Sequence, residues 1–462
     1  MPSHPDAVAL THLEERLDSP TAKGLAHAVS AAIRDGHLAP GDRLPPIRTV
    51  ATQLSLSPTT VSSAWALLAR SGAVATDGRR GTKVLDVRGG GTTRYRKALE
   101  RPSTFTLDLS TGVPDPALLP DLGPALAGLT TAPRTGSYLD DPVLPGLAEE
   151  LRRDWPFDVP EVAVVDGAMD AMDLLVRSRL RFGDRVVVED PAFPPLVDLL
   201  ESVGVQLVGV ALDDDGLSVE GLRAAMVEPV AAVFLQPRAQ NPTGVTMTGE
   251  RAQALARTLA DTEALSGSGA LVVEDDSAAG LSTSPLASLG RWLPDRTVHI
   301  RSFSKSHGPD LRLAALSAPA PVLGALAARR QLGQGWSSRL LQQVLLALLT
   351  DGDATAAVRT AAATYAARRA HVVDGLRARG VGVGGREGIN IWVPVHDETA
   401  AVVRLASQGI GVAPGAPFRL GAPPAEGGHV RVTTGLATGD LDSLVDALAD
   451  AAGATGWSGR AR

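Results

Sequence analysis

Apolar and polar positions in the first eighty-five residues of the chain follow a helical rhythm interrupted by turn signals. Apolar side chains recur three and four residues apart in three successive segments, as on the buried face of a helix. Pro45 and Pro46 suit the first turn of the second segment, and Ser57 is the expected N-cap of the third. The predicted helices span residues 21–36, 47–54 and 57–70.

Two short apolar runs follow these helices, at residues 73–76 and 82–85. The turn between them, Asp-Gly-Arg-Arg-Gly, has glycines on both sides of a basic tip, which predicts a β-hairpin. Three helices and a hairpin make a winged helix-turn-helix, and we assign it to residues 1–85. Residues 86–104 contain a glycine triplet, five basic side chains and no apolar period, so they are predicted to be a flexible linker.

From residue 105 to residue 462 the pattern changes to β-rich runs alternating with helical segments. This alternation predicts an α/β fold with a mostly parallel, doubly wound sheet whose ligand groups lie at the strand ends. The Ala- and Leu-rich stretch 321–380 predicts long helices, and a small C-terminal α+β subdomain is expected to contain strands at 389–395 and 429–434. The main-sheet strands are predicted at residues 162–165, 185–189, 205–210, 231–235, 270–274 and 297–301.

Composition narrows the class of protein. The 462 residues are 44% hydrophobic and 21% charged, which is typical of a soluble protein with two or three domains. The chain has no cysteine, so disulfides, thiolate metal sites and cysteine nucleophiles are excluded. We expect a cytoplasmic protein. Residues 1–10 have neither the basic cluster nor the apolar core of a signal peptide, and no apolar run approaches the roughly 20 residues of a membrane span.

The charge is distributed unevenly along the chain. The net charge is −7, but residues 21–85 contain eight basic and three acidic side chains, so this segment is basic and the remainder is strongly acidic. A basic module on an acidic body indicates nucleic-acid binding, whereas a charged solvated face is the alternative explanation. The short hydroxyl side chains at the start of the third helix would let the backbone approach phosphates.

The motif Ser-Phe-Ser-Lys at residues 302–305 gives the strongest chemical signal. Lys305 lies on a polar loop, with serines before it and Arg312 seven residues later. Upstream are Asn-Pro-Thr-Gly at 241–244 and Val-Val-Glu-Asp-Asp at 272–276. An amine in this setting is the layout that holds pyridoxal phosphate as a Schiff base.

The N-terminal segment resembles the GntR family of bacterial regulators. The resemblance lies in residues 33–48, in Thr60-Val61 and in Gly81-Thr82, and it departs from the family at Pro46, where a serine is usual. It implies that operator DNA is a partner. Together with the basic and hydroxyl pattern, it predicts a DNA-binding surface made of Arg43, Arg48, Ser57, Thr59, Thr60, Ser62, Arg79, Arg80 and Gly81.

The stretch from about 105 to 440 resembles the fold-type-I aminotransferases, which carry pyridoxal 5'-phosphate. By this resemblance Lys305 is the imine lysine, and it is the one catalytic residue we assign. Asp275 would pair with the ring nitrogen, Asn241 would donate to the phenolate oxygen, and Phe193 would stack on the ring. Arg431 matches the arginine that binds a substrate carboxylate.

The same resemblance implies a phosphate cradle. Two residues after Asp275 the family usually has a tyrosine, but this chain has Ser277, which is too short to reach the phenolate oxygen in the same way. The imine pKa and the transamination rate are therefore expected to differ from the family's. The implied cradle consists of Gly167, Ala168, Met169, Ser302, Ser304, Arg312 and, from a partner subunit, Tyr138.

A GntR-type head followed by an aminotransferase-like body is the layout of the MocR subfamily of regulators. The resemblance implies a homodimer that binds operator DNA and senses pyridoxal phosphate or its adduct with an amino compound. Two alternatives remain open: a working aminotransferase with an accessory DNA-binding domain, and a body that only dimerises. The effector is equally open.

Overall fold

The computed structural model describes two compact units of the chain. One comprises Met1–Thr93, Arg179–Val186 and Val197–Leu207, and the other comprises the remaining residues. Each is described by itself below. The described residues are 10, 13–17, 19–34, 37–39, 41–70, 74–77, 81–84, 105–129, 137, 140–266, 269–421 and 427–455.

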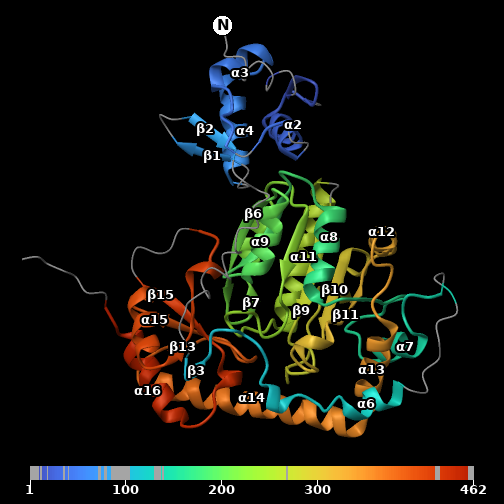
Figure 1. Cartoon of the computed structure of the whole chain (residues 1–462), viewed down its shortest axis with the longest axis vertical. Coiled ribbons are helices and arrows are strands. Elements are labelled where there is room, and N and C mark those ends of the chain that lie inside the picture. The colour runs from blue at the N-terminus through green and yellow to red at the C-terminus, as the bar shows by residue number, and fades with distance from the viewer. Residues whose placement is uncertain are drawn as a thin grey trace, which may run out of the picture. The chain divides into compact units, whose positions relative to one another are not determined.

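The described residues between 21 and 84 contain three helices and two paired strands, as the apolar spacing predicts (Figure 1). Ser57 caps the third helix, because its Oγ accepts a hydrogen bond from the Thr60 amide at 3.0 Å. Val61, Trp65 and Leu68 of that helix lie in the core. The elements are α2 (Ala22–Arg34), α3 (Ile47–Gln53), α4 (Pro58–Arg70), β1 (Val74–Asp77) and β2 (Gly81–Val84).

A very short third segment pairs with the hairpin. Strands β1 and β2 pair antiparallel, from Val74 opposite Val84 to Asp77 opposite Gly81. The segment before α3 joins the free side of β2, since the Leu44 amide donates to the Thr82 carbonyl at 2.9 Å and Arg43 forms a bridge with Lys83. This pairing fixes the basic side of the wing to the start of α3.

The strands between residues 163 and 317 form an eight-stranded sheet. The neighbours β8, β9 and β10 run parallel, whereas β11 pairs antiparallel with both β10 and β4. The six predicted main-sheet strands are confirmed with small differences in length, and β7 and β11 were not predicted. In sheet order the strands are β4 (Ala163–Val165), β11 (Ala314–Ser317), β10 (Thr297–Ser302), β9 (Leu271–Asp276), β8 (Ala232–Leu235), β5 (Arg185–Asp190), β6 (Gln206–Asp213) and β7 (Gly216–Leu217).

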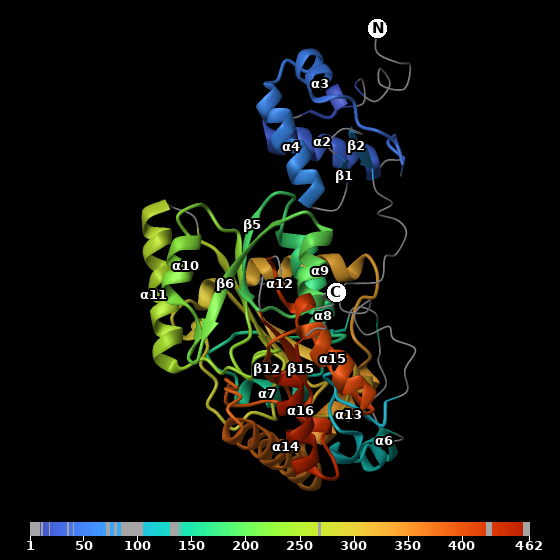
Figure 2. The same cartoon turned by 90° about the vertical axis from the view of Figure 1, so that its left-hand side faces the viewer.

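Helices cover both faces of this sheet. Figure 2 shows α10 and α11 on one side of it and α8 on the other. The central strands are buried on both faces, which explains why β8 and β9 read as continuous apolar runs rather than alternating ones. These helices are α8 (Ala168–Arg179), α9 (Pro194–Ser202), α10 (Val219–Ala225) and α11 (Gly249–Ser266).

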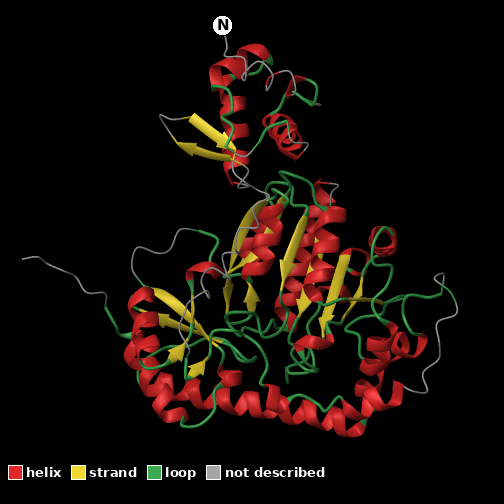
Figure 3. Ribbon diagram, in the orientation of Figure 1, coloured by secondary structure: helices red, strands yellow, loops and turns green. Residues whose placement is uncertain are grey.

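The expected long helices occupy the stretch after β11. The 27-residue α14 is the longest of them, and it runs between α13 and the small C-terminal sheet (Figures 1 and 3). None of the helices among the described residues combines the length and the apolar character needed to cross a bilayer. The other helices of this unit are α6 (Gly123–Gly128), α7 (Pro145–Arg153), α12 (Ala320–Gln331), α13 (Arg339–Thr350), α14 (Gly352–Ala378), α15 (Glu398–Ser407) and α16 (Leu441–Ala452).

The C-terminal subdomain is small and mixed, as expected. An antiparallel sheet in the order β12, β15, β14 packs with α15 and α16 around a core that includes Ile391, Leu405 and Leu448. The pair β13–β3 joins the start of the body to this subdomain, and it is parallel. The strands are β3 (Leu107–Asp108), β12 (Ile391–Val395), β13 (Ile410–Gly411), β14 (Ala413–Pro414) and β15 (Gly428–Val432).

Candidate functional site

A cavity of about 220 Å³ lies at the carboxyl ends of the parallel strands in the second unit. This is where a doubly wound sheet is expected to bind a ligand. Ser277, Gln236, Thr111, Gly112 and Met172 also line the cavity. The cavity brings together ten of the twelve residues predicted for the cofactor and substrate site: Lys305, Asp275, Asn241, Phe193, Ala168, Met169, Ser302, Ser304, Arg312 and Arg431.

Two predicted residues do not line the cavity. Gly167 lies immediately before the lining residues Ala168 and Met169 and has a φ of +101°. A Cβ at Gly167 would lie 3.1 Å from Nη2 of Arg312, so a larger residue would be strained there and would crowd the arginine. Tyr138 lies outside the described residues, and its assignment stays a prediction.

Asp275 is buried near the end of β9 and has one engaged and one free oxygen. Its Oδ2 accepts a hydrogen bond from Nε2 of Gln236 at 2.6 Å, whereas its Oδ1 is buried without a partner. Burial raises the pKa of this carboxyl to about 6, against the opposing effects of the Gln236 hydrogen bond and the Lys305 charge. A buried carboxylate oxygen with no partner in the protein is suited to a cationic or N–H donor of a ligand.

Lys305 follows β10 on the loop that the sequence motif predicted. Its Nζ lies 3.5 Å from Oγ of Ser277, the residue that replaces the family's tyrosine. Burial lowers the pKa of the amine, although the charge of Asp275 opposes that shift. A lower pKa increases the fraction of neutral amine, which is the nucleophilic form that attacks an aldehyde.

Asn241 is held so that its amide nitrogen remains available as a donor. Its Oδ1 accepts from Nδ2 of Asn390 at 3.4 Å and from Nη1 of Arg431 at 3.5 Å. Because the carbonyl oxygen is engaged twice, the NH₂ group is the part of the side chain left for a ligand oxygen. This orientation agrees with the donor role predicted for Asn241.

Arg431 comes from β15 and is only 1% exposed. Its guanidinium donates to the carbonyl of Ser110 and lies over the Phe418 ring, 5.2 Å from the centroid. Gly112 makes room for it, since a Cβ there would come within 2.9 Å of Nη1. Arg431 is therefore a pre-positioned cation at the edge of the cavity, suited to a carboxylate.

Anion-binding groups gather around the start of α8. Helix α8 begins at Ala168, so its first backbone amides and its dipole favour a negative charge there. Arg312 is fixed by a hydrogen bond from Nη2 to the Asp166 carbonyl at 3.2 Å. The amide of Ser304 donates to Oγ of Ser302 at 3.3 Å. Phosphate is the ligand group that this set of donors fits.

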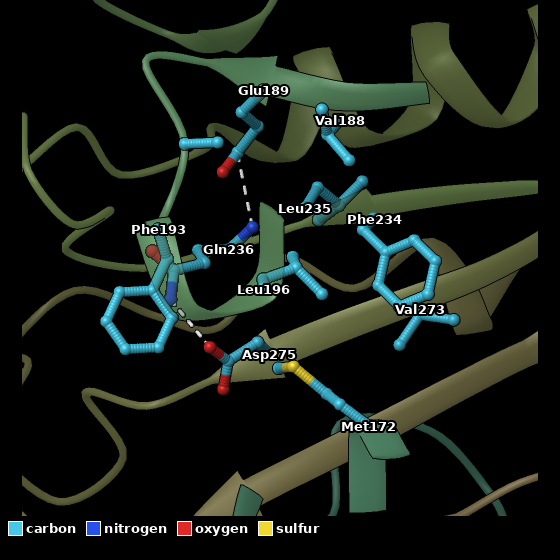
Figure 4. Close-up of a pocket in the computed structure, with 11 residues that line it drawn as sticks. Met172, Val188, Glu189, Phe193, Leu196, Phe234, Leu235, Gln236, Val273 and Asp275 are labelled. Atoms are coloured by element: carbon cyan, nitrogen blue, oxygen red, sulfur yellow. Dashed lines mark hydrogen bonds between the residues drawn. The ribbon is translucent and has the colours of Figure 1, made fainter. Parts of the chain in front are cut away.

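Gln236 is the important residue that the sequence analysis missed. Its Nε2 donates to Oδ2 of Asp275 and to Oγ of Ser277, the latter at 3.3 Å. Its Oε1 accepts from the backbone amide of Asn241 at 2.8 Å. The backbone amide of Gln236 donates to Oε1 of Glu189 at 3.1 Å (Figure 4). The available signal was its position, directly after the buried strand β8, where side chains at a sheet's carboxyl edge meet.

The predicted DNA-binding residues are exposed in the N-terminal segment where the structure describes them. Arg43, Arg48, Ser57, Thr59 and Ser62 are all exposed, and Thr60 is half-buried. Gly81 is also exposed and has a φ of +88° at the start of β2. Arg79 and Arg80 lie outside the described residues, so their role stays a prediction.

Comparison with known families assigns both parts of the chain. The aminotransferase class I and II family matches residues 106–448, and the gntR family of bacterial regulatory proteins matches residues 21–84. The chain belongs to the aminotransferase class I and II family and carries a gntR-family domain at its N-terminus. This combination is that of the MocR subfamily, and the predicted resemblance is confirmed.

The similar proteins include two named transcription regulators and a solved aminotransferase structure. The chain is 34% identical, over 88% of its length and 93% of the relative's, to the vitamin B6 salvage pathway transcriptional repressor PtsJ of Salmonella typhimurium. It is 29% identical, over 85% and 88%, to the HTH-type transcriptional regulator TauR of Rhodobacter capsulatus. The multiple substrate aminotransferase of Thermococcus profundus has a similar fold, with a TM-score of 0.68 at 21% identity, covering 77% of this chain and 93% of that one.

Proposed function

We propose that this protein is a transcription regulator that binds operator DNA with residues 1–85 and pyridoxal phosphate with residues 105–462. Residues 86–104 tether the two domains. The observation that carries the proposal is the presence, in one gntR-family chain, of a cavity that joins an amine, an unpartnered buried carboxylate oxygen and an anion cradle. A regulator needs a ligand site as well as a DNA surface, and this chain offers both.

The side chains of the cavity fit pyridoxal phosphate. When bound, this cofactor supplies an aldehyde that condenses with a lysine amine and a ring that acts as an electron sink. Lys305 would hold the aldehyde carbon, Asp275 would pair with the ring nitrogen, and Asn241 would donate to the phenolate oxygen. The start of α8, the two serines and Arg312 receive the phosphate, and Phe193 covers the ring.

The effector is pyridoxal phosphate itself or an amino compound that meets it in the cavity. Arg431 supports an amino acid, because a buried, pre-positioned guanidinium suits an α-carboxylate. The relative named for vitamin B6 salvage supports the cofactor as the signal. Either ligand controls DNA binding only if it has unequal affinity for two arrangements of the domains.

The proposed assembly is a cytoplasmic homodimer on a repeated or palindromic operator. Two heads related by a two-fold axis read two half-sites, which is how dimeric helix-turn-helix proteins reach specificity. In this assembly Tyr138 of the partner subunit contributes to the phosphate cradle. The short hydroxyl residues at the start of α4 and the arginines around α3 face the DNA backbone.

The test combines reductive trapping with DNA binding. Lys305 is the only lysine in residues 105–462, so a borohydride-reduced adduct maps to a single peptide. We expect the wild-type protein to turn yellow with pyridoxal phosphate and to gain the mass of the reduced cofactor, whereas Lys305→Ala does neither. The wing variant Lys83→Ala should trap the cofactor normally. A wild-type protein that stays colourless and gains no mass would refute the cofactor assignment.

The DNA arm uses fragments from the intergenic regions that flank the gene of this protein. Retention of one fragment in a gel shift, with an affinity that changes when pyridoxal phosphate is added, supports the regulator. The alternative is an active aminotransferase, which the buried Arg431 favours because it could grip a substrate. Multiple-turnover release of a keto acid, together with no retained DNA fragment, would replace the regulator by that enzyme.

A further inference from the structure

The loop that forms the anion cradle carries two acidic residues of its own. Asp166 and Asp170 flank the turn from β4 into α8, which includes the cavity residues Ala168 and Met169. Oδ2 of Asp170 accepts from the Asp166 amide at 3.1 Å, so this carboxylate stabilises the turn. Two carboxylates beside a site for a doubly charged phosphate would, however, oppose its binding unless a cation compensates them.

Arg330 supplies that cation from the end of α12. Its Nη1 lies 3.4 Å from Oδ2 of Asp170, and its Nη2 lies 3.4 Å from Oδ2 of Asp166. The Arg330 side chain is 9% exposed, whereas those of Asp166 and Asp170 are 26% and 30% exposed, so the two ion pairs are only partly screened by water and salt. Arg330 does not line the cavity. Its charge therefore acts on the ligand through the two aspartates.

The arginine is also held in place on its other side. Its Nη2 donates to Oγ of Ser337 at 3.0 Å, and that hydroxyl donates to the Val164 carbonyl at 3.2 Å. The connection from α12 to α13 is thus joined to β4 and to the loop that follows it. The Asp166 carbonyl, on the same loop, is the group that fixes Arg312. A shift of this loop would displace both the helix start and the arginine that lines the cavity.

We propose that Arg330 is a positioning residue for the phosphate of the bound cofactor. It offsets one of the two negative charges of Asp166 and Asp170 and holds their loop, so that the backbone amides at the start of α8 and the Arg312 guanidinium can attract the phosphate. The proposal rests on the proposed binding of pyridoxal phosphate. The effect of Arg330 must depend on the phosphate group of the vitamer, so it can be tested separately from cofactor binding itself.

The experiment compares two vitamers that differ only in that group. Pyridoxal phosphate and pyridoxal are titrated into the full-length protein, and each Kd is taken from the absorbance of the bound form. Arg330→Gln should weaken pyridoxal phosphate about tenfold or more, as expected when charges near a dianion lose their compensation. Its effect on pyridoxal should be less than about threefold, because that vitamer brings no phosphate charge to be repelled.

Two further variants separate charge from shape. The adjacent Arg329 is exposed, and Arg329→Gln should leave both Kd values unchanged. Arg330→Lys keeps the charge and should restore part of the preference for the phosphorylated vitamer. Asp170→Asn, which leaves Arg330 intact, removes one carboxylate and should strengthen pyridoxal phosphate relative to pyridoxal. This last measurement decides the matter if Arg330→Gln does not fold.

The outcomes are distinct. If Arg330→Gln weakens both vitamers equally, the arginine is only structural and the inference is wrong. It is equally wrong if Arg330→Gln leaves the ratio of the Kd of pyridoxal to the Kd of pyridoxal phosphate unchanged, or if Asp170→Asn lowers that ratio. In these cases the wild-type protein still binds pyridoxal phosphate and the proposed function stands. If the wild-type protein binds neither vitamer, the proposed function fails and this inference fails with it.

Discussion

Gln236 and Asp275 form a hydrogen bond of 2.6 Å, from Nε2 to Oδ2, which engages one of the two oxygens of a carboxylate that lines the cavity. The second oxygen, Oδ1, is left buried and without a partner. The Gln236 side chain is itself fixed, since its Oε1 accepts a hydrogen bond from the backbone amide of Asn241. One glutamine therefore orients the carboxylate that is proposed to contact the ring nitrogen and anchors the backbone of Asn241, whose side chain is proposed to contact the phenolate oxygen.

The first prediction concerns this glutamine. Gln236→Leu removes the donor to Asp275 and the acceptor for the Asn241 amide, so both partners lose a buried hydrogen bond. Such a loss costs about 1–3 kcal/mol, and the affinity for pyridoxal phosphate should fall roughly tenfold or more. Absorbance titration measures it. The exposed Gln331→Leu serves as the control. Unchanged affinity in Gln236→Leu would show that Asp275 is aligned without it.

The second prediction concerns pH. Burial raises the pKa of Asp275 to about 6, so this carboxyl is ionised above that pH and neutral below it. Only the ionised form stabilises a protonated ring nitrogen. The affinity for pyridoxal phosphate should therefore decrease as the pH falls through about 6, and Asp275→Asn should bind weakly with little dependence on pH in this range. A variant that keeps the wild-type pH profile would assign the titration to another group.

The sequence predicted the elements of this fold well because their signals are local. The buried strands β8 and β9 are continuous apolar runs, and Ser57 with Pro58 is a strong helix start. Strand β11 was missed, since Ala314–Ser317 is short and not β-branched. It is a strand because it completes the sheet between β10 and β4, which is a tertiary cause that no local pattern shows.

The candidate site was predictable only as far as its motifs reach. Lys305, Asp275 and Asn241 each stand in a recognisable sequence motif, and the structure brings them to one cavity. Gln236 and Arg330 have no such motif. Their partners are 39 and 160 residues away, at Asp275 and Asp170, so their roles appear only when the chain is folded. Residues that orient a site through other side chains are the part that sequence patterns leave out.

The third prediction concerns Glu189, which is buried behind the cavity. Its Oε1 accepts from the Gln236 amide, and burial raises its pKa from 4.5 to about 8. Between these values the folded protein holds a proton that the unfolded chain has lost, so stability should decrease as pH rises. The slope is roughly 1.4 kcal/mol per pH unit for one group. Glu189→Gln cannot titrate, and its stability should depend less on pH.

Urea denaturation of the body at several pH values between 5 and 8 measures this slope, with the wild type and Glu189→Gln compared at each pH. The comparison removes the contribution of all other groups, provided that they titrate alike in both proteins. Parallel pH profiles would mean that Glu189 is ionised in the folded protein throughout this range. Its two acceptor contacts, with the Gln236 amide and with Nε2 of Gln240 at 3.2 Å, would then be sufficient to hold the charge.

The last prediction concerns Ser57, which has a structural role and a proposed DNA-binding role. Its Oγ caps α4 by accepting from the Thr60 amide at 3.0 Å, and it is exposed at the helix start that is proposed to meet the phosphates. Ser57→Ala should destabilise the head by about 1 kcal/mol through loss of the cap.

Ser57→Asp restores a cap but adds a negative charge, so it should fold as well as the wild type and bind DNA more weakly. The exposed Ser63, which lies between one and two turns further along the same helix, provides the matched control Ser63→Ala for both measurements. Thermal unfolding and gel shifts at two salt concentrations separate the effects, because a phosphate contact changes the salt dependence and a lost cap does not. Normal DNA affinity in Ser57→Asp would place the DNA away from the start of α4.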